Sequence, residues 1–311
     1  MSKKLITSPS PHIRGRRTTQ NLMGDVVIAL LPALAAACYL FGARALLLSA
    51  VCVFSCVFFE WALCRLLKMD STIGDLSAVV TGLLLAFNLP AALPLWMAVI
   101  GSFTAIVVVK GLFGGIGQNF ANPAIVARIV LFVSFSSAMT TWVKPFSYQY
   151  PTADVITTAT PLALMRNGRW TEYADLFWGT TGGCLGETCA AALLLGGVYL
   201  VIRRVISPLV PLVYLGTVAL GAFLGGQDVL FHLLSGGLML GAIFMATDYT
   251  TSPTTTWGRV LFAFGCGAIT ILIRLFGSYA EGVSFAILFM NLLTPYLEKA
   301  TLPRVIGGAT E

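Results

Sequence analysis

The sequence contains few charged residues, and this shortage is its first informative feature. Asp, Glu, Lys and Arg together make up 10% of 311 residues, and there are only 2 histidines, whereas a soluble domain carries about 25% charged residues. Hydrophobic residues account for 57% of the chain, and the mean hydropathy is +0.87. This composition excludes an ordinary soluble enzyme, a disordered chain and a small disulfide scaffold. It predicts an all-α polytopic membrane protein.

Several motifs that carry chemistry are also missing. The 7 cysteines form no Cys-x-x-Cys pair, and they lie in or beside apolar runs, where cysteine acts as a small hydrophobic residue. No Walker loop and no nucleophile–base pair is found. We therefore expect no metal site, no iron–sulfur cluster and no catalytic side chain. The formal net charge of +6 is attributed to membrane topology rather than to nucleic-acid binding.

The apolar runs fit roughly ten membrane-spanning helices of about 20 residues each. The expected spans are 25–42, 45–66, 76–89, 94–110, 121–138, 183–202, 208–226, 230–247, 259–275 and 282–297. They divide the chain into an N-terminal arm, a first five-helix repeat, a polar loop, a second five-helix repeat and a C-terminal tail, at 1–24, 25–138, 139–182, 183–297 and 298–311.

Basic residues predict how these helices are oriented. If the N-terminus is cytoplasmic, the inner segments hold thirteen Lys and Arg residues and the outer segments hold five. Cytoplasmic loops carry the excess of Lys and Arg in membrane proteins. Both termini are therefore expected in the cytoplasm of a bacterial cell, with the loop 139–182 on the outer side of the inner membrane.

An internal repeat appears when the chain is shifted by about 162 residues. Gly24-Asp25 then meets Gly186-Glu187, and residues 109–114 resemble residues 273–277. Because each repeat has five spans, the second enters the membrane from the opposite side, which gives an inverted repeat of the kind found in transporters. The short third span and the Gly-interrupted eighth span occupy matching positions, and such pairs indicate a binding site.

A few charged residues in or beside the expected spans are candidates for ion coupling. They are Glu60, Asp248, Asp25 and Glu187. The competing interpretation of the last three is a solvated carboxylate or one near a helix terminus. Arg128 lies within the fifth span, where a charge is costly and is usually paired or functional. It is expected to partner either a cofactor or a buried acid.

The long polar loop contains an unusual run of hydroxyl groups. Residues 154–162 are Asp-Val-Ile-Thr-Thr-Ala-Thr-Pro-Leu. From the residues alone, the run is explained by a helix that starts at Pro161. Thr160 would then be its N-cap, because Thr is favoured at that position and Pro at the next.

This run also resembles the flavin-attachment motif of the membrane subunits RnfD and NqrB. These subunits belong to the Rnf complex and to the sodium-pumping NADH:quinone oxidoreductase. In that family the last Thr of the motif carries FMN through a phosphoester bond, and the matching residue here is Thr160. Asp154 and Ala159 match the motif as well. Thr157 and Thr158 stand where the family has Ser and Gly, so they remain competing attachment sites.

Two further segments carry the same resemblance, in the family's order. Residues 114–124 are similar to its Gly-Gly-Ile-Gly-Gln-Asn…Asn-Pro-Ala segment, and residues 246–253 to its Ala-Thr-Asp…Thr-Ser-Pro segment. The resemblance implies a non-covalent riboflavin in this subunit. We expect the Gly-rich segment to line its site, because glycine permits close approach to a flat ligand and amides suit the ring edge. The candidate residues are Gly117, Gln118, Asn119 and Asn122, with Arg128 further along.

The resemblance covers nearly the whole chain and is closer to RnfD, because NqrB-type chains have a longer N-terminal extension. It implies an electron-carrying subunit of an ion-translocating ferredoxin:NAD⁺ oxidoreductase that exports Na⁺ or H⁺. It also implies as partners the other membrane subunits, a peripheral flavoprotein and a flavin transferase. Two alternatives remain at this stage: an NqrB-type subunit, and a redox-inactive transporter built on the inverted repeat.

Overall fold

The computed structural model describes residues 18–68, 72–115, 117–149, 157–277 and 281–302. These residues form helices joined by loops, with two isolated β-bridges. The helices of the first half are α1 (Thr19–Phe41), α2 (Ala43–Leu66), η1 (Ile73–Asp75), α3 (Ser77–Phe87), α4 (Leu95–Phe103), the π-helix η2 (Thr104–Gly111) that continues α4, α5 (Pro123–Ser134) and α6 (Ser136–Met139).

The remaining helices belong to the polar loop and to the second half. They are η3 (Ser147–Gln149), α7 (Pro161–Arg166), α8 (Tyr173–Trp178), α9 (Ala190–Ile202), α10 (Leu209–Leu224), α11 (Val229–Leu234), α12 (Leu238–Leu240), the π-helix η4 (Gly241–Met245), α13 (Thr256–Phe276) and α14 (Val283–Thr301).

Each of the ten expected spans contains helix. In the described part of the chain, α1, α2 and α13 are long and apolar enough to cross a membrane, and several shorter apolar helices accompany them. The predicted helical class is therefore confirmed, and the composition of these helices indicates a membrane protein. The full number of spans stays a prediction.

Polar side chains determine where many of the helices begin. Asn122 caps α5 by accepting from the amide nitrogens of Ala124 and Ile125, and Pro123 follows it. Asp228 caps α11 in the same way through the amide nitrogen of Phe231. These caps satisfy amide groups that a helix leaves without partners.

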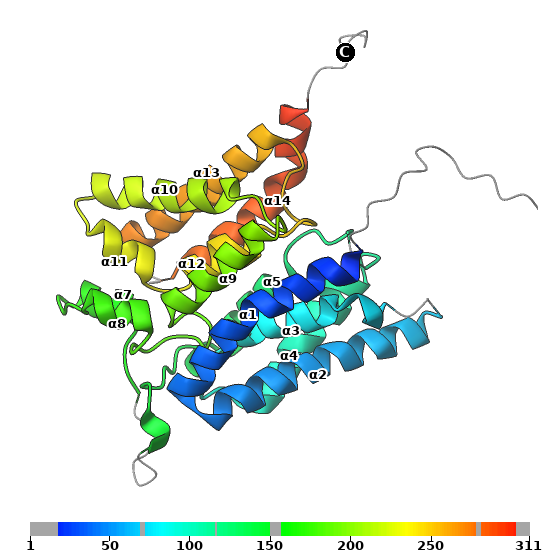
Figure 1. The fold of residues 1–311 in the computed structure, drawn as a ribbon, viewed down its shortest axis with the longest axis horizontal. Coiled ribbons are helices and arrows are strands. Elements are labelled where there is room, and N and C mark those ends of the chain that lie inside the picture. The colour runs from blue at the N-terminus through cyan, green and yellow to red at the C-terminus, as the bar shows by residue number, and fades with distance from the viewer. Residues whose placement is uncertain (1–17, 69–71, 116, 150–156, 278–280, 303–311) are drawn as a thin grey trace, which may run out of the picture.

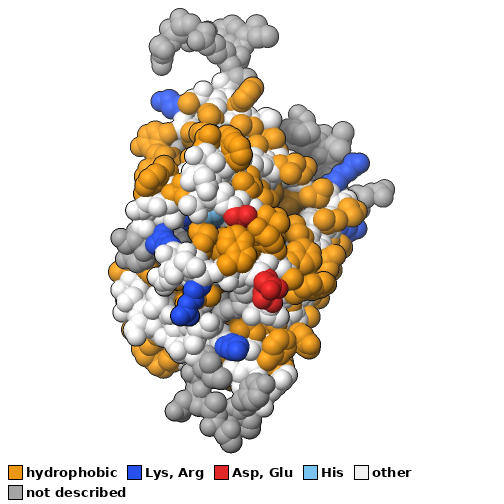
Figure 2. All heavy atoms as spheres, turned by 90° about the vertical axis from the view of Figure 1, so that its left-hand side faces the viewer, with side chains coloured by type: hydrophobic (Ala, Val, Ile, Leu, Met, Phe, Trp, Pro, Cys, Tyr) orange, Lys and Arg blue, Asp and Glu red, His pale blue; other side chains and the backbone are white. Residues whose placement is uncertain are grey.

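The described part of the loop between α6 and α9 gathers at one end of the helical bundle, which we call the Thr160 end. Its Phe146 amide donates to the carbonyl of Leu40 at the end of α1, over 2.7 Å. The Tyr173 hydroxyl donates to Asp228, and this bond together with the Phe231 amide lowers the pKa of Asp228. Viewed from the side of α7, α8 and α11, this surface shows few, scattered acidic and basic side chains (Figure 2).

The opposite end, which we call the Asp248 end, holds the start of α1 and the end of α14. Thr255, at the start of α13, lies 2.5 Å from Thr301 at the end of α14. Leu22 of α1, Ser77 of α3 and Asp248 line one cavity at this end. The α1–α2 turn, the end of α13 and the start of α14 lie at the Thr160 end, so α1 and α2 run in opposite directions, as do α13 and α14 (Figure 1).

Two short helices face each other in the middle of the bundle. The α3 helix has 11 residues and runs from the Asp248 end toward the Thr160 end. The chain of α11, α12 and η4 runs the other way and breaks at Ser235–Gly237, where Gly236 has a φ of +65°. Asn88, the C-cap of α3, reaches Met245 at the end of η4. The early end of α3 at Asn88 lies in the expected span that is short, and the break at Ser235–Gly237 lies in the expected span that is interrupted by glycine.

The two halves share one hydrophobic core. The α1 helix packs on α9, and α5 packs on α14 (Figure 1). A Cβ on Gly196 of α9 would collide with the carbonyl oxygen of Ala29 of α1. The halves therefore meet backbone against backbone, through small residues of the kind that allow close helix contacts in membranes.

Candidate functional site

Thr160 is buried at the start of α7. Its side chain is 5% exposed, and its hydroxyl oxygen accepts from the amide nitrogen of Ala163 over 3.4 Å. Pro161 takes the first helical position. The N-cap geometry expected from the residues alone is therefore present. In this cap the Thr160 hydroxyl group uses its oxygen as an acceptor, and its O–H does not take part.

The hydroxyl-rich run around Thr160 is held by the loop itself. The Thr158 amide donates to the carbonyl of Trp142, and Thr157 forms an isolated β-bridge with Val143. Thr158 also packs against Gly182, where a Cβ would meet its methyl group. Thr157 is exposed, and only Thr160 of the three threonines is buried. Asp154 lies outside the described residues.

Thr160 lines a cavity of about 170 Å³ that is rich in aromatic side chains. Trp142 comes from the polar loop, Phe132 from α5 and Phe285 from α14. Arg128 and Glu281 complete its polar side. The cavity therefore combines flat apolar walls, a buried hydroxyl and a guanidinium group.

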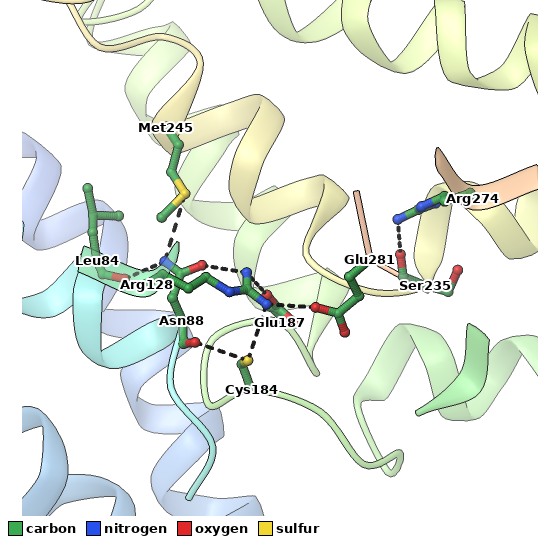
Figure 3. Close-up of polar contacts among 9 residues, drawn as sticks. All are labelled: Leu84, Asn88, Arg128, Cys184, Glu187, Ser235, Met245, Arg274 and Glu281. Carbon is green, nitrogen blue, oxygen red and sulfur yellow. Dashed lines mark hydrogen bonds and ion pairs between the residues drawn. The ribbon is translucent and has the colours of Figure 1, made fainter. Parts of the chain in front are cut away.

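Arg128 is the centre of a buried polar cluster behind this cavity. Its Nη1 donates to Glu187 over 2.6 Å and to Asn88 over 2.8 Å, and its Nη2 donates to Glu281 over 2.6 Å. Cys184 lies 3.7 Å from Nη2. Figure 3 shows the guanidinium surrounded by these four residues. Arg128 and Asn88 belong to the first half, and the two carboxylates to the second, so the cluster joins the halves.

Glu187 also lies against the start of α12. A Cβ on Gly237 would sit 2.5 Å from the Glu187 Oε1 atom, so glycine is needed for this approach. The start of the α12–η4 segment carries the positive end of the helix dipole. It therefore attracts the Glu187 carboxylate, in addition to the attraction by Arg128. Arg274, at the end of α13, donates to the carbonyl of His232 over 2.5 Å. It also donates to the carbonyl of Ser235 over 3.0 Å (Figure 3).

A second cavity, of about 90 Å³, lies at the Asp248 end. It brings the Gly-rich segment and the Ala-Thr-Asp segment together, because Asn119, Asn122 and Asp248 all line it. The Asn122 amide donates to Asp248 over 3.5 Å, and Asp248 also accepts from the Thr250 amide. Among the described residues, the Asn119 Oδ1 atom is buried without a hydrogen-bond partner.

Glu60 forms an ion pair that sequence spacing did not reveal. Lys110, at the end of η2, donates to Glu60 and to Ser77, over 2.6 Å in each case, and Thr72 also donates to Glu60. Both charged residues are buried. Lys110 lines both the second cavity and a third of about 240 Å³, and Glu60 lines the third. Gly114 and Gly115 form part of the wall of the third cavity.

The other candidates lie apart from these clusters. Asp25 of α1 accepts from Tyr199 over 3.0 Å and pairs with Arg203 near the bundle surface. Gly117 has a φ of +92°, which favours glycine, and within the described structure no atom lies near enough to meet a Cβ. Gln118 turns back onto Gly114. Arg128 is placed with Thr160 and not with the Gly-rich segment.

Sequence reasoning missed several members of these sites. Glu281 adjoins the last expected span, and its acidic charge beside an apolar run was the available signal. Lys110 is one of the thirteen inner basic residues, and its sequence position indicates only topology. Trp142, Phe132 and Phe285 carried no local signal, because aromatic residues are common in apolar helices and loops.

Comparisons with known proteins give a consistent result. Residues 6–307 match the model of the NQR2, RnfD, RnfE family. The chain is 51% identical over 308 residues to the D subunit of the Na⁺-translocating ferredoxin:NAD⁺ oxidoreductase complex of Acetobacterium woodii, covering 97% of this chain and 95% of the relative. It is 40% identical over 328 residues to the D subunit of the proton-translocating ferredoxin:NAD⁺ oxidoreductase complex of Clostridium ljungdahlii, covering 99% and 98%.

A third relative, the D subunit of the ion-translocating oxidoreductase complex of Halorhodospira halophila, is 38% identical over 335 residues, with 96% and 94% covered. All three relatives are subunits of multi-subunit oxidoreductase complexes that translocate ions. The family match spans nearly the whole chain, and the predicted resemblance is confirmed. This chain belongs to the NQR2, RnfD, RnfE family, as a D-type subunit of an ion-translocating oxidoreductase.

Proposed function

We propose that this chain is the integral membrane, electron-carrying subunit of a ferredoxin:NAD⁺ oxidoreductase complex that exports Na⁺ or H⁺. It holds FMN covalently on Thr160 and riboflavin without a covalent bond. The observation that carries the proposal is the buried hydroxyl of Thr160 at the wall of an aromatic cavity, in the loop motif that resembles the family's attachment site.

The residues around Thr160 suit a flavin nucleotide. Trp142, Phe132 and Phe285 offer faces and edges on which a flat ring packs favourably. Arg128 provides positive charge on the polar side of the cavity, where a phosphoester adds negative charge. A flavin supplies reversible electron transfer, and the protein contributes position, burial and hydrogen bonds.

The proposed riboflavin site is the cavity at the Asp248 end. Asn119 presents a buried carbonyl oxygen without a partner among the described residues, and Asn122 and Asp248 lie beside it. An imide N–H at the edge of a flavin ring would satisfy such an acceptor. The Gly-rich segment forms the adjoining loop, which supports its assignment as part of the site.

Ion coupling is assigned to carboxylates that line the cavities, of which Glu60 and Glu187 are buried and Asp248 is half-buried. Glu60 and Asp248 line cavities at the Asp248 end, and Glu187 lines one at the Thr160 end. Asp25 is paired near the surface with Arg203, which is exposed, and is the weakest of the four. The matching placement of Lys110 near the start of α3 and of Arg274 near the start of α12 supports an inverted repeat.

The proposed location is the inner membrane of a bacterium, with both termini in the cytoplasm. The helices support a shared side for the two termini, because α1 begins and α14 ends on the same side of the bundle. The cytoplasmic side is chosen from the excess of Lys and Arg in the inner segments. The loop that carries Thr160 lies on the other side.

The test is in-gel fluorescence of the denatured chain, expressed with a flavin transferase. The wild-type band should fluoresce under ultraviolet light, and Thr160→Ala should be dark because the attachment oxygen is gone. Thr160→Ser should keep the signal, since Ser offers the same oxygen. Thr157→Ala and Thr158→Ala are matched controls and should fluoresce normally.

The same samples test the riboflavin assignment. Riboflavin should appear in the supernatant after denaturation, and Asn119→Ala should lower its amount without changing the fluorescent band. A dark wild-type band would contradict covalent attachment. Fluorescence in Thr160→Ala that is lost in Thr158→Ala would move the attachment to the neighbouring residue.

A further inference from the structure

A small polar cavity lies between Thr160 and the Arg128 cluster. Its volume is about 10 Å³, and a cavity of about 10–15 Å³ is the smallest that holds one water molecule. Glu187, Glu281 and Thr188 contribute polar side chains to its wall, and Gly182, Gly183 and Gly236 bring backbone close to it. The space fits a single water molecule or a smaller ion.

Two of the oxygen atoms in this wall lack partners. Glu187 is 4% exposed and Thr188 is 5% exposed. Among the residues that the structure describes, the Glu187 Oε2 atom and the Thr188 hydroxyl are buried without hydrogen bonds. Leaving such groups unpaired is costly, so an occupant that satisfies both is favoured.

The chemistry of the wall points to a cation. Two carboxylates flank the cavity, and within the described part of the chain only Arg128 pairs with them, at 2.6 Å from each. Carboxylate, hydroxyl and carbonyl oxygens are the ligands that hard cations prefer. A dehydrated Na⁺ is smaller than a water molecule and fits the space. K⁺ is about the size of a water molecule and binds oxygen at longer distances, so this small space favours Na⁺.

The surrounding charges predict weak binding. Arg274 lies on the far side of Gly236, where a Cβ would sit 3.3 Å from its Nη2 atom and 3.8 Å from Glu281 Cγ. With Arg274 included, the positive charges of two guanidinium groups equal the negative charges of the two carboxylates around the cavity. An ion held by its nearest oxygens but opposed by this arginine leaves readily, as a translocation site requires.

We propose that Glu187, Thr188 and Glu281 form a binding site for a monovalent cation of Na⁺ size, next to Thr160 at the end of the bundle opposite to Asp248. The site rests on the proposed role in ion translocation. It places the release side of the pathway between the flavin-bearing loop and the start of α12.

The experiment is thermal unfolding of the purified full chain at constant ionic strength. NaCl replaces choline chloride stepwise, and LiCl and KCl are compared. A ligand that binds only the native state raises the unfolding temperature. We expect a saturable rise with Na⁺ and Li⁺ and none with K⁺ beyond that with choline.

Thr188→Val preserves the shape of the side chain and removes one ligand. It should raise the Na⁺ concentration for half-maximal effect at least tenfold, and Glu187→Gln should do the same. Thr104→Val is the matched control, because Thr104 is also buried and its hydroxyl bonds to the carbonyl of Ile100 in its own helix. It should respond to Na⁺ as the wild type does.

Several outcomes would overturn the site. A wild type that does not respond to Na⁺ would do so, as would an equal response in Thr188→Val. A response that follows pH instead, lost in Glu187→Gln but kept in Thr188→Val, would identify a proton site. Covalent flavin is measured in the same samples, and Thr188→Val should retain it. If flavin is absent throughout, the cation test still stands, because its ligands are side chains of this chain.

Discussion

At the scale of single residues, Arg128 shows how this chain tolerates buried charge. The energetic cost of burying a guanidinium is offset only when carboxylates and other acceptors surround it closely. Glu187, Glu281 and Asn88 provide that surrounding, each within 2.8 Å. Because the partners come from both halves, the arginine ties the halves together as well.

Removing this charge should destabilise the protein strongly. In Arg128→Met two buried carboxylates lose their partner, and breaking a buried pair costs about 3–5 kcal/mol. The measurement is the free energy of unfolding in mixed micelles. Adding Glu187→Gln and Glu281→Gln should recover most of the loss, since no uncompensated charge then remains.

A matched control comes from Arg203, which pairs with Asp25 but is exposed. Arg203→Met should change stability little, because surface ion pairs contribute little. Equal effects of Arg128→Met and Arg203→Met would show that the buried cluster does not hold the halves together.

At the scale of elements, the short helix α3 depends on close packing. A Cβ on Gly82 would lie 2.7 Å from the Cα atom of Val53 in α2. This distance forces one helix to move. The approach places Ser77, at the start of α3, within 2.6 Å of Lys110, so packing and the polar cluster at the Asp248 end are linked.

Gly82→Ala should therefore lower the free energy of unfolding by about 1–3 kcal/mol, the usual cost of overpacking. Gly216 in α10 is the control, since no atom of the described structure lies within 4 Å of its Cβ position. Gly216→Ala carries the same gain in helix propensity without a clash. Thermal unfolding of both variants separates the two effects, and a Gly82→Ala variant as stable as Gly216→Ala would refute the close contact.

At the scale of the whole molecule, the two ends of the bundle carry different sites. The aromatic cavity, Thr160 and the Arg128 cluster lie at one end. The Asn122–Asp248 contact and the Lys110–Glu60 pair lie at the other. The two proposed flavins would thus be separated along the helices, which suits a subunit that carries electrons through a membrane.

This arrangement predicts which residues face which side of the membrane. Arg169→Cys, at the Thr160 end, should react with a membrane-impermeant maleimide in intact cells. Lys299→Cys, at the end of α14, should react only in inside-out vesicles. Wild type is the control for labelling of its own cysteines, of which Cys38 and Cys64 are half-buried and the others are buried. The opposite labelling pattern would reverse the proposed orientation.

Much of this protein is determined by its sequence alone. The helical class follows from long apolar runs, because a backbone in lipid must satisfy its own hydrogen bonds. The breaks at residues 88–94 and 235–237 follow from Asn, Pro and Gly. The N-cap position of Thr160 follows from the Thr-Pro pair. The family follows from three short segments that can be recognised in the sequence without knowledge of the fold.

Only the tertiary structure decided which charges meet. Arg128 and Glu281 are separated by more than 150 positions, and Glu60 and Lys110 by 50, so no local pattern relates them. Spacing along one helix cannot reveal a partner on another. The physical reason is that each buried charge is compensated across the contact between helices, and that contact exists only when the halves are folded together.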